Sequence, residues 1–112
     1  MKFDRELMRG AGPLAVMTLL SSREMYGYEL VEALESRSQG VLEMGQSTLY
    51  PMLYNLEAQE LVSSRVVQAA SGRPRKYYSL TKKGERRLLS DKEQWNALTA
   101  ALAALGMVEG RA

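Results

Sequence analysis

The chain changes its hydrophobic period near Leu61, and this change constrains the fold more than any other feature. Before Leu61, apolar side chains recur at helical spacing, whereas "LVSSRVVQ" and "KYYSL" are rich in β-branched and aromatic residues. Between these two segments, "AASGRPR" holds the glycine and proline of a turn. After Leu80 a helical pattern runs for about 25 residues without proline, which predicts a helix about 37 Å long. The sequence therefore predicts a mainly α fold with one small β-hairpin and a long C-terminal helix.

Two short helices are expected at the start of the chain. Pro13 opens the apolar run "PLAVMTLL", and because proline is tolerated in a first helical turn, we expect a buried helix from Pro13 to about Ser21. The segment "YGYELVEALESRSQG" then places apolar residues at helical spacing. It predicts a second helix from about Gly27 to Arg37.

A third helix is expected within "GQSTLYPMLYNLEAQELV", which precedes the hairpin. One apolar stripe runs along it, because successive residues turn by about 100°; its members are Leu49, Met52, Leu53 and Leu56. Pro51 is tolerated only near a helix start. Ser47 or Thr48 is therefore the expected N-cap, and at most one backbone hydrogen bond is lost.

The side of this helix opposite the leucine stripe carries no charge. It consists of Ser47, Pro51, Tyr54 and Ala58, flanked by Thr48, Tyr50 and Asn55. Helix surfaces that face solvent normally carry charged residues, so this face is expected to meet a ligand. In a helix-turn-helix followed by a hairpin wing, hydroxyl and amide groups on such a face reach DNA base edges and phosphates. The alternative is that Tyr50 and Tyr54 pack beneath the hairpin without touching a ligand.

Positive charge is concentrated in one part of the chain. The net charge is +2, yet residues 61–90 contain eight cations and only one anion, a local balance of +7 that leaves −5 for the rest. This asymmetry indicates a basic surface for a polyanion on an otherwise acidic body. The alternative is an ordinary solvated face of lysine and arginine.

Composition excludes several functions. The chain has 112 residues, of which 46% are apolar, so it can build one small domain around a single core. It contains neither cysteine nor histidine, which removes disulfides, the usual zinc ligands and the usual general base. We therefore expect no enzyme, no metal site and no cofactor. Without 18 consecutive apolar residues, we expect a cytoplasmic protein that does not bind membranes.

The C-terminal helix carries a short coiled-coil seam. Leu88, Trp95 and Leu102 are seven residues apart, and Leu98 and Leu105 occupy the other core position of the heptad. We expect this seam to pair with its equal in a second copy across a two-fold axis. The alternative is that the helix folds back over its own domain. Trp95 either packs in the seam or forms one wall of a pocket for a small aromatic effector.

Three linked motifs carry a resemblance to a known family. The segments "MYGYELVEAL", "STLYPMLYNLEAQELV" and "GRPRKYYSLTKKG" occur in this order, and the likeness covers about Leu14 to Gly84. The chain resembles the PadR family of winged-helix transcriptional regulators, in particular compact members with a single C-terminal helix. The resemblance implies a DNA-binding domain at residues 1–80 and a dimerisation helix at 81–112. It also implies a homodimeric regulator, expected to be a repressor, that often senses a small molecule.

The resemblance assigns DNA contacts to two segments. The start of the recognition helix carries Ser47, Thr48 and Tyr50, and the wing carries Gly72 to Lys76. Arginine on a narrow turn suits a minor groove, and lysine suits phosphates. The candidate DNA-binding residues are Gln46, Ser47, Thr48, Tyr50, Tyr54, Asn55, Arg73, Arg75, Lys76 and Lys82. A homodimer would read a pseudo-palindromic operator in double-stranded DNA; the alternative function is a winged-helix module that binds another protein and no DNA.

Overall fold

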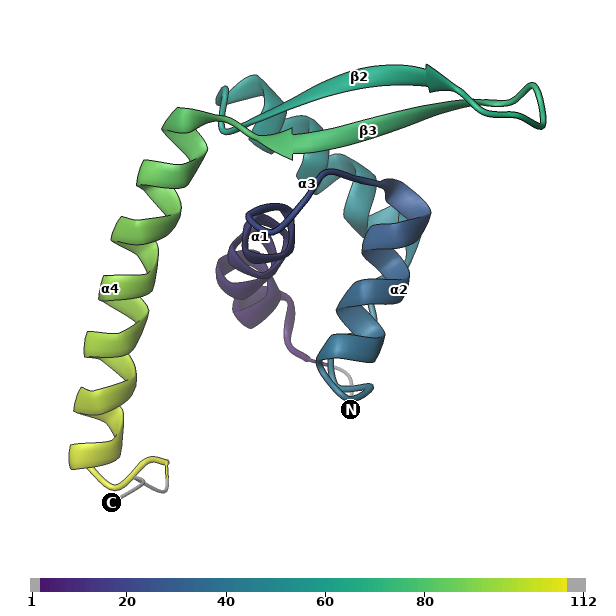
Figure 1. Ribbon diagram of the computed structural model, residues 1–112. Helices are drawn as coiled ribbons and strands as arrows, with labels where there is room; N and C mark the ends of the chain where they lie inside the picture. Colours follow the sequence, from purple (N-terminus) through teal and green to yellow (C-terminus); the bar gives the residue numbers. More distant parts are fainter. Residues whose placement is uncertain (1–2, 109–112) are drawn as a thin grey trace.

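The computed structural model describes residues 3–108, so the outer ends of the two expected domains, 1–2 and 109–112, lie outside the described residues. Over these residues, four helices and three strands follow one another (Figure 1): α1 (Arg5–Leu20), β1 (Met25–Tyr26), α2 (Gly27–Arg37), α3 (Gln46–Ala58), β2 (Val62–Gln68), β3 (Pro74–Leu80) and α4 (Lys82–Ala104). The sheet lies over α1, α2 and α3, and α4 descends from the end of β3 along one side. The prediction of a mainly α winged helix-turn-helix with a long last helix is confirmed.

Helix α1 begins at Arg5, well before the expected start at Pro13. The carboxylate of Asp4 caps it by accepting a hydrogen bond of 2.8 Å from the backbone N–H of Glu6. Pro13 consequently lies inside the helix, where it has no N–H to donate to the preceding turn. The first half of α1 was not predicted, because small residues stand there in place of the apolar ones that mark a helical period. One of them, Gly12, allows close packing: an added Cβ would lie only 2.6 Å from Cε of Met52.

Helices α2 and α3 are the two helices of the helix-turn-helix. Helix α2 has the expected bounds. Helix α3 begins earlier than expected: its N-cap is Gly45, not Ser47 or Thr48. The carbonyl of Gly45 accepts hydrogen bonds from the N–H groups of Thr48, at 3.1 Å, and Leu49, at 3.0 Å. Pro51 therefore lies in the second turn of α3, and one backbone hydrogen bond is lost there.

The leucine stripe of α3 lies at the centre of the core. Leu49 and Leu53 are completely buried, Leu56 is 3% exposed, and Met52 is half-buried against them. Most of the other buried side chains come from α1, α2, β2, β3 and the first turns of α4, and they include Val16, Leu30, Val62, Tyr78 and Leu88. The expected inward face of α3 is thus the observed one.

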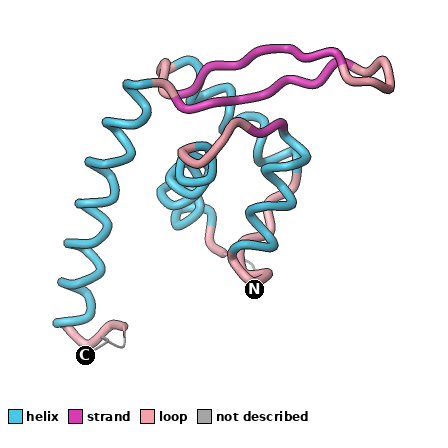
Figure 2. The backbone as a smooth tube through the Cα atoms, viewed as in Figure 1, coloured by secondary structure: helices cyan, strands magenta, loops and turns pink. Residues whose placement is uncertain are grey.

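The sheet contains the expected hairpin and one strand that the sequence did not predict. Its order is β1-β3-β2 and all pairs are antiparallel. Strand β1 pairs only with Tyr77 and Tyr78, so most of the hairpin projects beyond it as a two-stranded ribbon (Figure 2). A two-residue strand shows no period, and only its pairing with β3 defines it. Strand β3 begins at Pro74, so Pro74 and Arg75 belong to the strand and not to the turn.

One corner fixes the direction in which α4 leaves the sheet. The hydroxyl of Thr81 accepts a hydrogen bond of 2.9 Å from the N–H of Gly84 and donates one of 2.7 Å to the carbonyl of Glu60. The N–H of Thr81 also donates to the carbonyl of Leu61, at 3.1 Å. Gly84 packs so closely on this carbonyl that an added Cβ would clash with it.

This contact predicts the outcome of Gly84→Ala. Alanine is favoured over glycine in a helix by about 1 kcal/mol, but here its methyl group would meet backbone atoms that have little room to move. We expect a net loss of about 1–3 kcal/mol in the free energy of unfolding, measured by urea denaturation. Gly10→Ala in α1 is the matched control: its Cβ would find only Trp95, at 4.0 Å. Equal effects of the two substitutions would contradict the close packing at Gly84.

Candidate nucleic-acid interface

The charge-free face of α3 is exposed along its whole length. Ser47, Pro51, Tyr54 and Ala58 are all exposed, and Tyr54 retains 55% of its accessible surface. Gln46 is exposed at the beginning of the helix. Burial of the leucine stripe turns these residues outward, because the two sets lie on opposite sides of the helix. The face therefore offers hydroxyl, amide and aromatic groups without a competing charge.

Thr48 and Asn55 lie on one edge of this face. They line an open groove of about 450 Å³ between α1, α3 and the start of α4, together with Arg9, Pro13 and Asp91. The side-chain amide of Asn55 accepts a hydrogen bond of 2.5 Å from Gln59, one turn later. Both residues thus lie at the border between the exposed face of α3 and this groove.

Tyr50 lies on the opposite edge and is half-buried. Its hydroxyl packs against Gly27 at the start of α2, where an added Cβ would clash with it. Its ring stacks on the ring of Tyr54, with 6.2 Å between centroids and 29° between planes. The alternative from the sequence was packing beneath the hairpin; Tyr50 instead packs against α2 and supports the ring of Tyr54.

The wing ends in a tight turn that exposes Arg73. Gly72 has a φ of +87°, which favours glycine. Its N–H donates to the carbonyl of Ala69 at 2.9 Å, and its carbonyl accepts from the side chain of Gln68 at 2.6 Å. Within residues 3–108, Arg73 has no ion-pair partner. Its guanidinium is therefore available to a polyanion.

Arg75 is held on the outer surface of the wing by an aromatic ring. Its guanidinium carbon lies 4.7 Å from the ring centroid of Tyr26, a cation–π contact that leaves the charge exposed. The ring of Tyr26 in turn meets the ring of Tyr77 edge-on, with 5.4 Å between centroids. Lys82, the first residue of α4, is also exposed.

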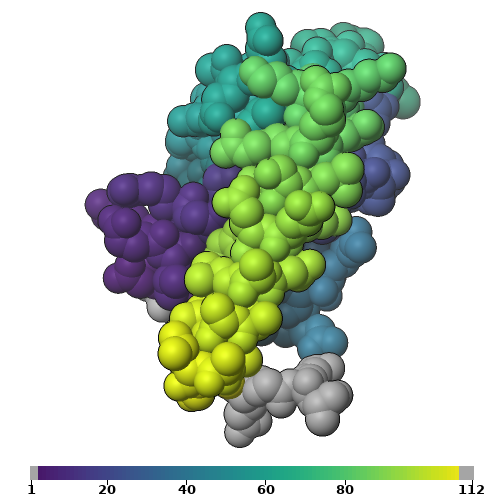
Figure 3. All heavy atoms as spheres, turned by 90° about the vertical axis from the view of Figure 1, so that its left-hand side faces the viewer, coloured from purple at the N-terminus to yellow at the C-terminus, as the bar shows by residue number. Residues whose placement is uncertain are grey.

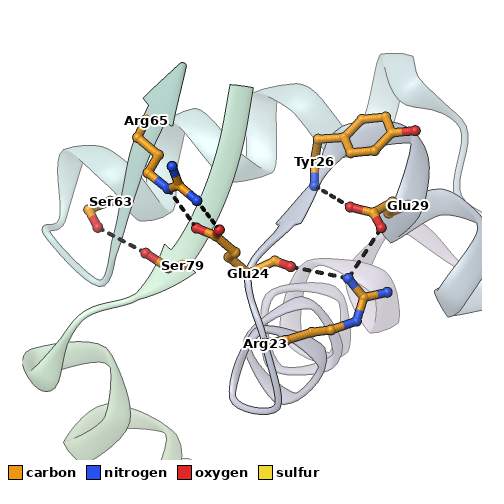
Figure 4. Close-up of polar contacts among 7 residues, drawn as sticks. All are labelled: Arg23, Glu24, Tyr26, Glu29, Ser63, Arg65 and Ser79. Atoms are coloured by element: carbon orange, nitrogen blue, oxygen red, sulfur yellow. Dashed lines mark hydrogen bonds and ion pairs between the residues drawn. The ribbon is translucent and has the colours of Figure 1, made fainter. Parts of the chain in front are cut away.

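Arg65 is neutralised, although the sequence counts it within the basic segment. Its Nε and Nη2 both donate to the carboxylate of Glu24, which precedes β1, and the Nε–Oε2 distance is 2.9 Å (Figure 4). The hydrogen bonds from Arg65 hold the pKa of Glu24 below its usual value, against the opposing effect of burial. Glu29 in the same view accepts from the N–H of Tyr26 at 3.1 Å and pairs with Arg23 at 3.2 Å.

Other cations of the segment have carboxylate partners as well. Nζ of Lys76 lies 3.6 Å from Oε1 of Glu57 on α3, and Nε of Arg87 lies 3.2 Å from Oδ1 of Asp91. The partners of Arg65 and Lys76 were not apparent in the sequence, because Glu24 and Glu57 lie far along the chain from these cations. Arg73 at the tip of the wing and Arg75 on its outer surface are therefore the most available positive charges of the wing.

The seam residues of α4 have different surroundings. Leu88 is 3% exposed and packs in the protein's own core, while Leu102 is half-buried. Leu98 and Leu105 are 50% and 81% exposed, and Leu105 lies just after the end of the helix. Trp95, 37% exposed, borders an open apolar groove of about 370 Å³ between α1 and α2.

This geometry defines the class of protein. A recognition helix with an exposed, uncharged face, beside a hairpin that exposes Arg73 at its tip and Arg75 on its outer surface, is the arrangement of winged helix-turn-helix proteins that bind DNA. The sequence matches the transcriptional regulator PadR-like family over residues 16–90, and the chain belongs to this family. Within residues 3–108, no helix is long and apolar enough to cross a membrane.

Individual relatives agree with this assignment. The chain is 31% identical over 81 residues to the transcriptional regulator YqjI of Escherichia coli strain K12; the match covers 72% of this chain but only 37% of YqjI. A PadR family transcriptional regulator from Eggerthella lenta is 36% identical, with a TM-score of 0.74 and coverage of 88% of this chain and 86% of that one. A PadR-like regulator from Bacillus cereus is 25% identical, with a TM-score of 0.78 and coverage of 93% and 99%. These relatives are transcriptional regulators, not enzymes.

The pairing of the wing cations predicts a difference between two arginine substitutions. Arg73→Gln should reduce the slope of log K against log salt for duplex DNA by about 1, because one phosphate contact is lost. Arg65→Gln should leave this slope nearly unchanged, because Glu24 already binds Arg65. Fluorescence anisotropy at neutral pH measures both slopes. Equal decreases would mean that Arg65 leaves Glu24 and binds DNA.

Proposed function

We propose that the protein is a sequence-specific repressor that binds a pseudo-palindromic operator as a homodimer and is released by a small aromatic effector. The observation that carries this proposal is the exposed, charge-free face of α3 next to the wing. The ring centroid of Tyr54 on that face lies 5.5 Å from Nζ of Lys76 on β3, so the two surfaces adjoin. One duplex can contact both.

The two surfaces have different tasks in this proposal. Ser47 and Tyr54, with Gln46 at the helix start, reach base edges in the major groove, while Arg73 and Arg75 meet the minor groove beside it. Lys82 contacts phosphate. Base contacts then supply the preference for the operator, whereas the wing supplies affinity for any DNA.

The proposed dimer is built from α4, residues 81–112 being the dimerisation segment and 1–80 the DNA-binding domain. Figure 3 views the molecule from the side of α4, which runs down the middle of this face between α1 and α2. Exposed apolar side chains occur in the first turn of α1, on α4 and just after α4: Leu7, Leu98, Leu105 and Met107. Exposed apolar side chains along and just after the last helix support an interface with a second copy.

The proposed effector site is the groove beside Trp95. Its walls are mainly apolar and come from α1, α2 and the segment after α2: Ala11, Leu14, Leu19, Ala33, Leu34 and Leu42. A groove of about 370 Å³ with an indole at its border has the size and lining suited to a flat aromatic molecule. Because Trp95 lies on α4, such a ligand would touch the DNA-binding domain and the dimerisation helix at once.

Binding to DNA tests the proposal directly. The purified protein should bind DNA from upstream of its own coding region about a thousandfold more tightly than scrambled DNA. Affinity should fall steeply as salt is raised. A footprint on the bound DNA should reveal half-sites about 34 Å apart. Binding that is negligible or equal for both DNAs would contradict the proposal and favour a module that binds another protein.

The proposed interface predicts that substitutions at two exposed leucines of α4 affect dimerisation differently. Leu98 and Leu89 are 50% and 65% exposed, but they are nine residues apart and so lie about 180° apart around the helix. Leu98→Asp should raise the dimer dissociation constant about 30-fold, as expected for a central apolar contact. Leu89→Asp should leave it unchanged. Light scattering across a dilution series measures both, and a monomeric wild-type protein would contradict the proposed dimer.

A further inference from the structure

Glu57 connects the recognition helix to the wing through two contacts. One carboxylate oxygen accepts a hydrogen bond of 2.6 Å from the hydroxyl of Ser64 on β2. The other lies 3.6 Å from Nζ of Lys76 on β3. A single carboxylate on α3 therefore holds both strands of the wing.

Aromatic rings complete this contact. Nζ of Lys76 lies 5.5 Å from the ring centroid of Tyr54 and 5.4 Å from that of Tyr78. Burial lowers the pKa of Lys76, but Tyr78, Glu57 and Tyr54 together raise it above its usual value, so the ammonium group stays charged. We call Tyr54, Glu57, Ser64, Lys76 and Tyr78 the wing-base cluster.

The cluster also supports the exposed ring of the recognition helix. The ring of Tyr54 contacts Lys76 and also stacks on the ring of Tyr50. Tyr50 in turn packs on Gly27 of α2. The backbone of α2 at Gly27 and the side chains of Tyr50, Tyr54 and Lys76 thus form a continuous series of contacts beneath the surface proposed to meet DNA.

Backbone hydrogen bonding leaves the tilt of the wing weakly determined. Strand β1 supports β3 only at Tyr77 and Tyr78. Lys76 lies one residue beyond that support, where the hairpin is a two-stranded ribbon, and such ribbons are marginally stable and readily twisted. The ribbon is therefore held from both of its faces, by the contact of Lys76 with α3 on one face and by the contact of Arg75 with Tyr26 on the other.

We propose that Glu57 is a positioning residue for operator recognition, which holds the wing through Lys76 and Ser64 at the tilt where Arg73 and the face of α3 meet the same duplex. This inference rests on the proposed function. It assigns Lys76 to orienting the wing, whereas the sequence assigned it to phosphate binding.

The negative charge of Glu57 makes its positioning role testable. A carboxylate near the DNA surface repels phosphates, so its removal by itself should strengthen binding to every DNA sequence. A positioning role predicts the opposite for the operator, because a wing that is released from α3 no longer meets DNA in register with it. The two effects differ in their dependence on DNA sequence.

Glu57→Gln is the informative substitution, since the amide can still accept the hydrogen bond from Ser64. We expect the ratio of operator to scrambled-DNA affinity to fall about tenfold, with scrambled-DNA affinity unchanged or higher. Glu93→Gln, at an exposed carboxylate of α4, changes the charge equally and should leave the ratio unchanged. Anisotropy titrations at several salt concentrations supply the affinities, and thermal unfolding verifies that both variants fold.

Lys76→Gln and the double variant Glu57→Gln/Lys76→Gln complete the test. If the two residues act through each other, each single variant and the double variant should lose the same operator preference. Additive losses, or equal strengthening of binding to both DNAs by Glu57→Gln, would overturn the inference while leaving the proposed function intact. A wild-type protein without operator preference would overturn both.

Discussion

Burial of the leucine stripe of α3 is the interaction on which the other features of this fold depend. Complete burial of a leucine contributes about 1.5–3 kcal/mol, and Leu49 and Leu53 are entirely removed from solvent. Because the side chains of a helix have fixed angular positions, this burial also decides what the other sides of α3 meet. Tyr54 faces outward, Tyr50 meets α2, and Glu57 reaches the wing.

The ion pairs of the basic segment affect where positive charge is available more than they affect the stability of the fold. Exposed ion pairs contribute little to folding free energy, so the pairs of Arg65 with Glu24 and Lys76 with Glu57 mainly determine where positive charge remains available. On the wing, positive charge remains available at the tip, at Arg73, and on the outer surface, at Arg75. The segment that reads as uniformly basic in the sequence is thus divided into cations that orient the wing and cations that can meet a polyanion.

Elements with a clear local pattern could be predicted from the sequence. Helix α2 has the predicted bounds, and the two long strands lie where β-branched and aromatic residues alternate. The first half of α1 could not be predicted, because small residues such as Gly12 replace the apolar period where helices approach closely. The start of α3 was placed too late, because a backbone cap at Gly45 needs no capping side chain.

The sequence by itself determined the helices, the hairpin and the uncharged face of α3, since spacing along the chain fixes which side chains share one side of a helix or strand. Only the tertiary structure decided which cations are paired and which residues support Tyr54. Glu24 and Arg65 are 41 residues apart, and only the packing of the sheet brings them together. Contacts of this kind depend on how separate elements pack, and no local pattern in the sequence encodes that packing.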